Sequence, residues 1–129
     1  MKLAAATLEN AWLRLEPFAD RHRDGLIAAG ADASIWRHNP FVTPERGYAA
    51  WFDLLRAEQD AGRWIPHAVV AEGRIVGQSC YLALRPEHSS IEIGGTWYTP
   101  VAQGTAVNPA AKLLLLGHAF DSGAERVEL

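Results

Sequence analysis

The sequence has very little cysteine and no surplus of positive charge, and both absences exclude classes of function. Cys80 is the only cysteine, so neither a disulfide nor a thiolate metal cluster can form within the chain. A reducing compartment is therefore expected. Lys and Arg total 12 against 15 Asp and Glu, for a net charge of −3. This balance argues against a nucleic-acid partner, which usually requires a basic surface.

Long apolar runs are also missing. No stretch approaches the roughly 20 apolar residues of a membrane-spanning helix, and residues 1–7 lack the basic start and apolar run of a signal peptide. The histidines lie too far apart to suggest a zinc site, so no metal is expected. No Gly-x-Gly-x-x-Gly or Gly-x-x-x-x-Gly-Lys-Ser/Thr string occurs, which disfavours a general nucleotide binder. We expect a soluble cytoplasmic protein.

The first half of the chain predicts one strand and two helices. Residues 12–17 alternate apolar and charged side chains, as in a half-buried strand. Asp20 is the expected cap of a helix over residues 21–29 that ends at Gly30. Thr43-Pro44-Glu45 combines a capping hydroxyl, a proline and an acid, and predicts a second helix that ends near Gly62.

The second half predicts three strands, a helix and a final strand. Residues 67–71 and 74–82 form an expected hairpin around Glu72-Gly73, and residues 90–98 form the next strand. Asn108 is the expected cap of a helix over residues 109–122, whose leucine run 113–116 predicts deep burial. The order indicates a single α/β domain (of the α+β kind) over residues 1–129, with a mostly antiparallel sheet flanked by helices.

The chemistry is expected in the segment from Ile91 to Lys112, where a strand leads through a tight loop into the last helix. The loop residues Gly104, Thr105 and Ala106 are small, so an anion can approach their backbone. The N–H groups of a first helical turn have no internal partner and favour negative charge. These features predict a pyrophosphate site, to which Lys112 would add a cation.

At this loop the sequence resembles the GNAT superfamily of N-acetyltransferases. Gly104-Thr105-Ala106 matches the end of the superfamily's Arg/Gln-x-x-Gly-x-Gly/Ala loop, whose first position is Val101 here. The string Glu-Ile-Gly … Pro-x-x-Gln-Gly-Thr-Ala-Val-Asn-x-x-Ala-Lys is similar to the ribosomal-protein-alanine acetyltransferases. Members of the family continue with a helix and two strands beyond the strand that matches residues 126–129. By this resemblance, the chain lacks the final helix and strands and is truncated.

The resemblance implies transfer of an acetyl group from acetyl-CoA to a primary amine, either a protein amino terminus (a ribosomal protein's among them) or a small amine. A homodimer is also compatible with the family. Glu92 is the candidate catalytic base, with a purely structural carboxylate as an equal alternative. The expected contacts to acetyl-CoA come from the strand end, the loop and the helix start: Trp97, Tyr98, Gln103, Gly104, Thr105, Ala106, Val107, Asn108 and Lys112.

Several alternatives stay open at this point. Trp36, His38 and Phe41 are candidates for the acceptor pocket, and ordinary packing is the alternative for each. Cys80 is expected to be a small buried residue, because no base lies beside it in the sequence. For the whole chain, the alternative to an enzyme is a catalytically idle module for acyl-CoA binding or dimerisation.

Overall fold

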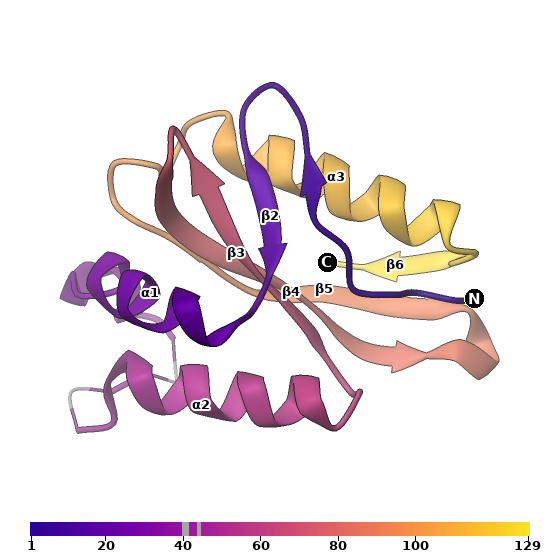
Figure 1. Ribbon diagram of the computed structural model, residues 1–129, viewed down its shortest axis with the longest axis horizontal. Helices are drawn as coiled ribbons and strands as arrows, with labels where there is room; N and C mark the ends of the chain where they lie inside the picture. Colours follow the sequence, from indigo (N-terminus) through magenta and orange to yellow (C-terminus); the bar gives the residue numbers. More distant parts are fainter. Residues whose placement is uncertain (40–41, 44) are drawn as a thin grey trace.

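The computed structural model describes residues 1–39, 42–43 and 45–129, and it forms one curled sheet with helices on both faces (Figure 1). The sheet has six strands in the order β1-β2-β3-β4-β5-β6. All neighbours pair antiparallel except β5 and β6, which are parallel. The strands are β1 (Leu8–Glu9), β2 (Arg14–Pro17), β3 (Ile65–Ala71), β4 (Arg74–Arg85), β5 (Ser90–Tyr98) and β6 (Arg126–Glu128).

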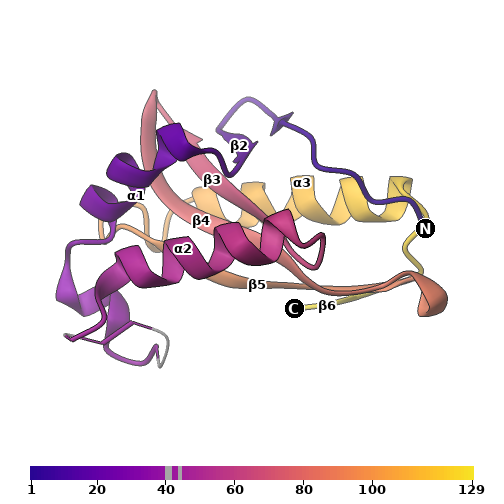
Figure 2. The ribbon, with the colours of Figure 1, turned by 60° about the horizontal axis from the view of Figure 1, so that its bottom comes forward.

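The helices divide the molecule into two cores. Helices α1 (Arg23–Ala29) and α2 (Gly47–Asp60) cover one face of the sheet, and α3 (Val107–Asp121) covers the other (Figures 1 and 2). Short 3₁₀ turns η1 (Asp20–His22), η2 (Ala33–Trp36) and η3 (Pro86–His88) lie between these elements. Because successive side chains of a strand point to opposite faces, Trp97 joins the core under α1 and α2, and Tyr98 joins the core under α3. The predicted α/β class and the antiparallel sheet are confirmed.

The hairpin and the following strand form where the sequence predicted them. Glu72 and Gly73 both have positive φ, 51° and 73°, which a two-residue turn of this hand requires. Strand β4 runs further than expected, to Arg85. Strand β5 spans the predicted residues 90–98. Strand β5 lies between β4 and β6, and it carries the first part of the segment expected to hold the chemistry.

The predicted helix starts were displaced by local hydrogen bonds. Asp20 does not cap a helix over 21–29, because the turn η1 comes first and the Ala19 N–H donates to Nδ1 of His22 at 2.9 Å. Helix α2 begins at Gly47, although Thr43 Oγ1 still accepts the Arg46 N–H at 3.2 Å. Pro44, the second part of that predicted start, lies outside the described residues.

Helix α3 begins two residues earlier than predicted. Asn108 is its second residue and not its cap, since the helix spans Val107–Asp121 after Ala106. Ala106 is the residue before the helix and has no side chain that could cap it, and the Thr105 hydroxyl accepts the Val107 N–H at 3.3 Å. Lys112 consequently lies in the second turn of α3 and not in the first.

The deep burial expected for the leucine run of α3 is wrong. The buried stripe consists mainly of alanines and one leucine, Ala110, Ala111, Leu115 and Ala119. Leu113 is 68% exposed and Phe120 is 50% exposed. The sheet covers only one side of the helix, and no other element of the described chain covers the opposite side. Within the described ranges, no helix is long and apolar enough to cross a bilayer.

A buried carboxylate that the sequence did not reveal holds β2 against the start of α1. Glu16 Oε1 lies 2.8 Å from Nε2 of His22 and accepts a hydrogen bond from Arg21 at 3.0 Å. Arg14 Nε donates to Oε2 at 2.6 Å. The hydrogen bond to His22, followed by those from the two arginines, lowers the pKa of Glu16 to about 2. The carboxylate is therefore charged in the folded protein at neutral pH.

His67 on β3 makes the stability of the fold depend on pH. It is fully buried, and burial, followed by the nearby charge of His118, lowers its pKa to about 4. In the unfolded chain the ring titrates near 6.5, so acid protonates the unfolded state first and stability falls as the pH drops below that value. Between about pH 8 and pH 5 the expected loss is about 2 kcal/mol of unfolding free energy.

Urea unfolding at the two pH values measures this loss. His67→Gln should remove about that amount of the pH dependence, whereas His88→Gln, at an exposed position, should leave it unchanged. If the unfolding free energy of His67→Gln falls between the two pH values as much as that of the wild-type chain, other groups cause the acid sensitivity.

Candidate functional site

The loop from Thr99 to Ala106 is built by short-range hydrogen bonds that leave its outer side open. The Ala102 and Gln103 N–H groups both donate to the Thr99 carbonyl, at 3.0 and 3.1 Å. Gly104 has a φ of 72°, a conformation that favours glycine. A Cβ built on Gly104 meets no atom within 4 Å. The space outside Gly104 is therefore free for a ligand to approach the backbone.

Three backbone donors of the loop and the helix start are unpaired. The N–H groups of Gly104, Ala106 and Asn108 have no hydrogen-bond partner within the described chain. The Thr105 N–H donates to the Ala102 carbonyl at 3.3 Å, and the Val107 N–H to the Thr105 hydroxyl. Unpaired N–H groups were expected at every position from 104 to 108, but the structure leaves only those of 104, 106 and 108 unpaired. Unpaired donors at a helix N-terminus favour an anionic group.

Two residues predicted to contact the cofactor also hold the loop together through their side chains. Gln103 Nε2 donates to the Tyr98 carbonyl at 3.0 Å. Thr105 Oγ1 donates to the Ala102 carbonyl at 2.6 Å. Lys112 forms no ion pair with the described residues, and partial burial lowers the pKa of its ammonium. Its single charge is thus uncompensated close to the opening.

Strand β5 presents an open edge beside the loop. Strand β6 pairs with β5 only over Ser90, Ile91 and Glu92, so from 93 to 98 this edge has no strand partner in the part of the chain that the structure describes.

Trp97 Nε1 and the Tyr98 hydroxyl are buried and have no hydrogen-bond partner. Buried polar groups are usually paired, and burial raises the pKa of Tyr98 to about 12. Both groups are donors without an acceptor.

Glu92 does not lie at the loop. It is half-buried and pairs with Leu82 of β4 on one side and with Glu128 of β6 on the other. It lies six positions before Tyr98, which is about 20 Å along an extended strand. Because Ile91 and Ile93 belong to the α3 core, the Glu92 side chain lies on the face covered by α1 and α2. That is also the face of Trp97.

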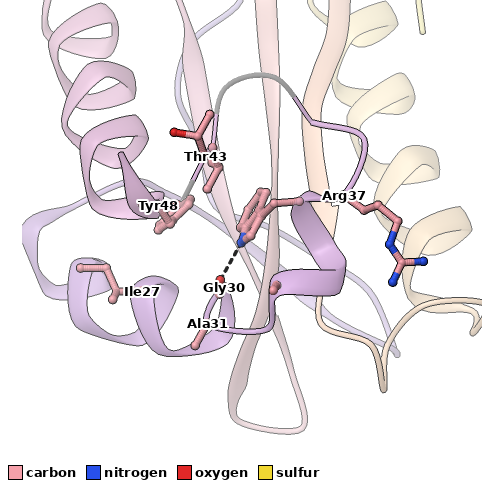
Figure 3. Close-up of a pocket in the computed structure, with 10 residues that line it drawn as sticks. Ile27, Gly30, Ala31, Arg37, Thr43 and Tyr48 are labelled. Atoms are coloured by element: carbon pink, nitrogen blue, oxygen red, sulfur yellow. Dashed lines mark hydrogen bonds between the residues drawn. The ribbon is translucent and has the colours of Figure 1, made fainter. Parts of the chain in front are cut away.

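On this face a pocket of about 560 Å³ opens between α1, η2 and α2 (Figure 3). Its lining consists of Ile27, Gly30, Ala31, Ala33, Trp36, Arg37, Val42, Thr43, Gly47 and Tyr48. Trp36 Nε1 donates to the Gly30 carbonyl at 2.7 Å, the bond drawn in Figure 3. Trp36, one of the residues predicted for the acceptor pocket, thus lies in the lining of this pocket. His38 does not line the pocket, because its side chain is exposed beyond η2, and Phe41 lies outside the described residues.

An aromatic cluster connects the pocket to β5. The ring centroids of Trp36 and Trp97 lie 5.1 Å apart, and those of Tyr48 and Trp97 lie 5.2 Å apart. Trp51 packs into the same core, as its apolar helical spacing indicated. Cys80 is fully buried there, and burial raises the pKa of its thiol to about 12. It is a packed thiol with no nucleophilic character, in agreement with the sequence-based expectation.

Tyr48 has a structural role that its place in an apolar stripe did not reveal. Its hydroxyl donates to Gln78 Oε1 at 2.6 Å, and Gln78 Nε2 donates to the Gly95 carbonyl at 2.8 Å. Burial raises the pKa of Tyr48, so the hydroxyl remains a donor. This buried chain ties helix α2 to the irregular part of β5, where Gly95 has a φ of 59°.

Tyr48→Phe is expected to lower the unfolding free energy by about 1–3 kcal/mol, because Gln78 Oε1 would be left buried without a donor. Tyr98→Phe is the matched control: its hydroxyl has no partner, so its removal should cost little. Equal losses in the two variants, measured by denaturant unfolding, would contradict the role of the Tyr48 bond.

In comparisons with known proteins, no family model and no curated protein matched the sequence, whereas many solved structures matched the fold. A probable acetyltransferase of the GNAT family from Chromobacterium violaceum superposes with a TM-score of 0.85 at 26% identity, over 98% of this chain and 66% of that one. A GCN5-related N-acetyltransferase from Brucella melitensis superposes with a TM-score of 0.79 at 25% identity, over 94% of this chain and 57% of that one. RimJ from Mycobacterium smegmatis superposes with a TM-score of 0.73 at 21% identity, over 95% of this chain and 66% of that one.

This chain spans about two thirds of the length of the first of these acetyltransferases and 57% of the second. Within that span its strands and helices follow theirs almost throughout. The likeness to RimJ, at 21% identity, is distant and concerns the fold alone. The curled sheet, with two helices on one face and one on the other, gives this chain the fold of the GNAT acetyltransferases.

Proposed function

We propose that this chain binds acetyl-CoA at the start of α3 and transfers the acetyl group to a primary amine. The observation that carries the proposal is the set of three unpaired N–H groups at Gly104, Ala106 and Asn108, together with the open outer side of Gly104. Such a set of donors at the positive end of a helix dipole suits a diphosphate. Lys112 adds a nearby positive charge.

The open edge of β5 supplies the next part of the site. An extended pantetheine arm presents amide groups, which pair with a strand edge as another strand would. In this proposal the arm lies along the β5 edge from 93 to 98, which has no strand partner among the described residues. A β5 backbone N–H stabilises the oxyanion that forms when the amine attacks the thioester.

Glu92 is the proposed base. The attacking ammonium must lose a proton before it attacks the thioester carbon, and a carboxylate can accept it directly or through water. Glu92 lies on β5, on the face of the sheet that also carries the aromatic pocket. Its distance from the loop suits a role at the acetyl end of the cosubstrate and not at the phosphates.

Similar proteins support this ligand. RimJ was solved in complex with a CoA disulfide, and the self-immunity acetyltransferase MccE with acetyl-CoA and AMP. Both are less than 25% identical to this chain, so the argument for the ligand rests on the loop geometry above. The proposed acceptor is a small amine or a protein amino terminus, including that of a ribosomal protein.

Calorimetry with acetyl-CoA tests binding, and release of free CoA thiol with a panel of amines tests turnover. Saturable binding with amine-dependent thiol release is the expected result. Absence of acetyl-CoA binding by the folded chain would contradict the proposal. Binding without thiol release from any amine would instead favour the idle acyl-CoA-binding module.

A further inference from the structure

The pocket between α1, η2 and α2 has an unusual balance of charge for an amine-binding site. Among its ten lining residues, Arg37 is the only one with an ionisable charge near neutral pH. Asp32 and Glu45 are close in sequence but do not line the pocket. The Asp32 carboxylate accepts the Ser34 N–H at 2.8 Å, and Glu45 is bonded to Thr43. No carboxylate of the described residues is therefore presented to a bound cation.

The walls of the pocket are apolar and held in place. Ile27, Val42 and the rings of Trp36 and Tyr48 form most of the surface. Trp36 and Tyr48 stack with centroids 5.8 Å apart, and the bond from the indole to Gly30 fixes the position of Trp36. A volume of about 560 Å³ is in the ordinary range for small-molecule sites. Burial of an apolar side chain here is favoured by about 25 cal/mol per Å².

The pocket adjoins the strand on which the reaction is proposed to occur. A Cβ on Gly30 would lie 3.3 Å from the Trp97 ring, so the floor of the pocket rests on β5. Glu92 lies on the same face of that strand. An amine can therefore point toward β5 while its side chain stays among the rings.

Arg37 is available for recognition at the rim. It is exposed, and it has no ion pair or hydrogen bond with the residues the structure describes. In Figure 3 its guanidinium extends away from Tyr48. A free guanidinium binds a carboxylate through two parallel hydrogen bonds. It repels ammonium groups, which would also lose hydration at the apolar wall.

We infer that the acceptor is a small amine that carries both a large apolar side chain and a carboxylate, as an apolar amino acid does, and that polyamines are rejected. The side chain occupies the aromatic pocket, and the carboxylate pairs with Arg37. The ammonium group then faces β5 and loses one proton, and the resulting amine attacks the thioester carbon. The C–S bond breaks, so that CoA leaves as the thiol and the acceptor keeps the acetyl group as an amide. This inference rests on the proposed acetyl transfer for its chemistry, but its binding step does not need acetyl-CoA.

Three probe amines separate the contributions: phenylalanine, phenethylamine, which lacks the carboxylate, and spermidine, which is a polycation. Calorimetry without acetyl-CoA should show phenylalanine binding roughly 10-fold more tightly than phenethylamine, the effect of one charged hydrogen-bond pair, and no binding of spermidine. Arg37→Glu should abolish the preference for phenylalanine, and Arg37→Lys should retain part of it. Because Arg37 is exposed, both variants should fold, as circular dichroism can verify.

The outcomes distinguish this inference from the proposed function. Phenylalanine binding that depends on Arg37, in a chain that does not bind acetyl-CoA, would support the pocket and overturn acetyl transfer. Acetyl-CoA binding with thiol release to spermidine, or an unchanged preference in Arg37→Glu, would overturn the inference and leave acetyl transfer intact.

Discussion

Gly104→Asp is expected to weaken acetyl-CoA binding by at least about 100-fold, or about 2.7 kcal/mol. The new carboxylate would occupy the open space outside Gly104, where the diphosphate is proposed to bind. Like charges about 4 Å apart repel by about 4 kcal/mol at the effective dielectric constant of a protein surface. Aspartate tolerates the left-handed backbone better than most residues, so the loop should keep its shape.

Two matched variants isolate the electrostatic part of this effect. Gly104→Asn has nearly the same size and backbone tolerance without the charge, and it should lose much less affinity. Gly62→Asp places the same side chain at a φ of 76°, also with open space around it, but far from the loop. The unfolding free energy of Gly62→Asp therefore reports how much the backbone strain alone destabilises the chain. Equal affinities of Gly104→Asp and the wild-type chain in calorimetry would place the phosphates elsewhere.

Gly77→Ala is expected to destabilise the fold by about 3 kcal/mol or more. A Cβ at Gly77 would clash with the Trp97 carbonyl oxygen and would lie 2.8 Å from the Tyr98 ring. The first contact is with backbone, so strands β4 and β5 must separate at the residues proposed to border the cosubstrate. Overpacking of a tight core usually costs 1–3 kcal/mol, and a clash with backbone exceeds that range.

Gly117→Ala is the control for this substitution. Gly117 lies within α3, and a Cβ there meets nothing within 4 Å, so alanine should stabilise the helix by roughly 0.5–1 kcal/mol. Denaturant unfolding of the two variants should therefore give changes of opposite sign. An unchanged unfolding free energy in Gly77→Ala would mean that β4 and β5 are less closely paired near Tyr98 than in this structure.

The positions of the strands were predictable because they depend on local signals. The Glu72-Gly73 turn acts within a few residues and recurs in the structure. The strand predicted over 12–17 forms over Arg14–Pro17 only, and its alternation is broken because Trp12 is exposed and Glu16 is buried. The helix starts were less predictable, because side chains compete for the same backbone donors. At α3 the Thr105 hydroxyl accepts the Val107 N–H, and Asn108 is the second residue of the helix and not its cap.

The candidate site was predictable only in part. The loop of small residues before a helix pointed to Gly104, and the open, positive-φ backbone agrees with that expectation. The pocket was not predictable as a whole, because its walls come from α1, η2 and α2, which are distant in sequence. Tyr48 and Arg37 carry no local signal of their positions, since each depends on how α2 and η2 pack onto β5.

The sequence by itself determined the strand periodicity, the glycine turns and the small-residue loop, because these follow from backbone conformations accessible to a few neighbouring residues. Tertiary structure alone decided which face of α3 is buried, which loop amides stay unpaired, and which side chains enclose the pocket. These properties depend on contacts between segments far apart in the chain, such as Tyr48 with Gln78 and Trp36 with Trp97. No local pattern encodes such contacts, because the free energy of each arises only when the two surfaces meet.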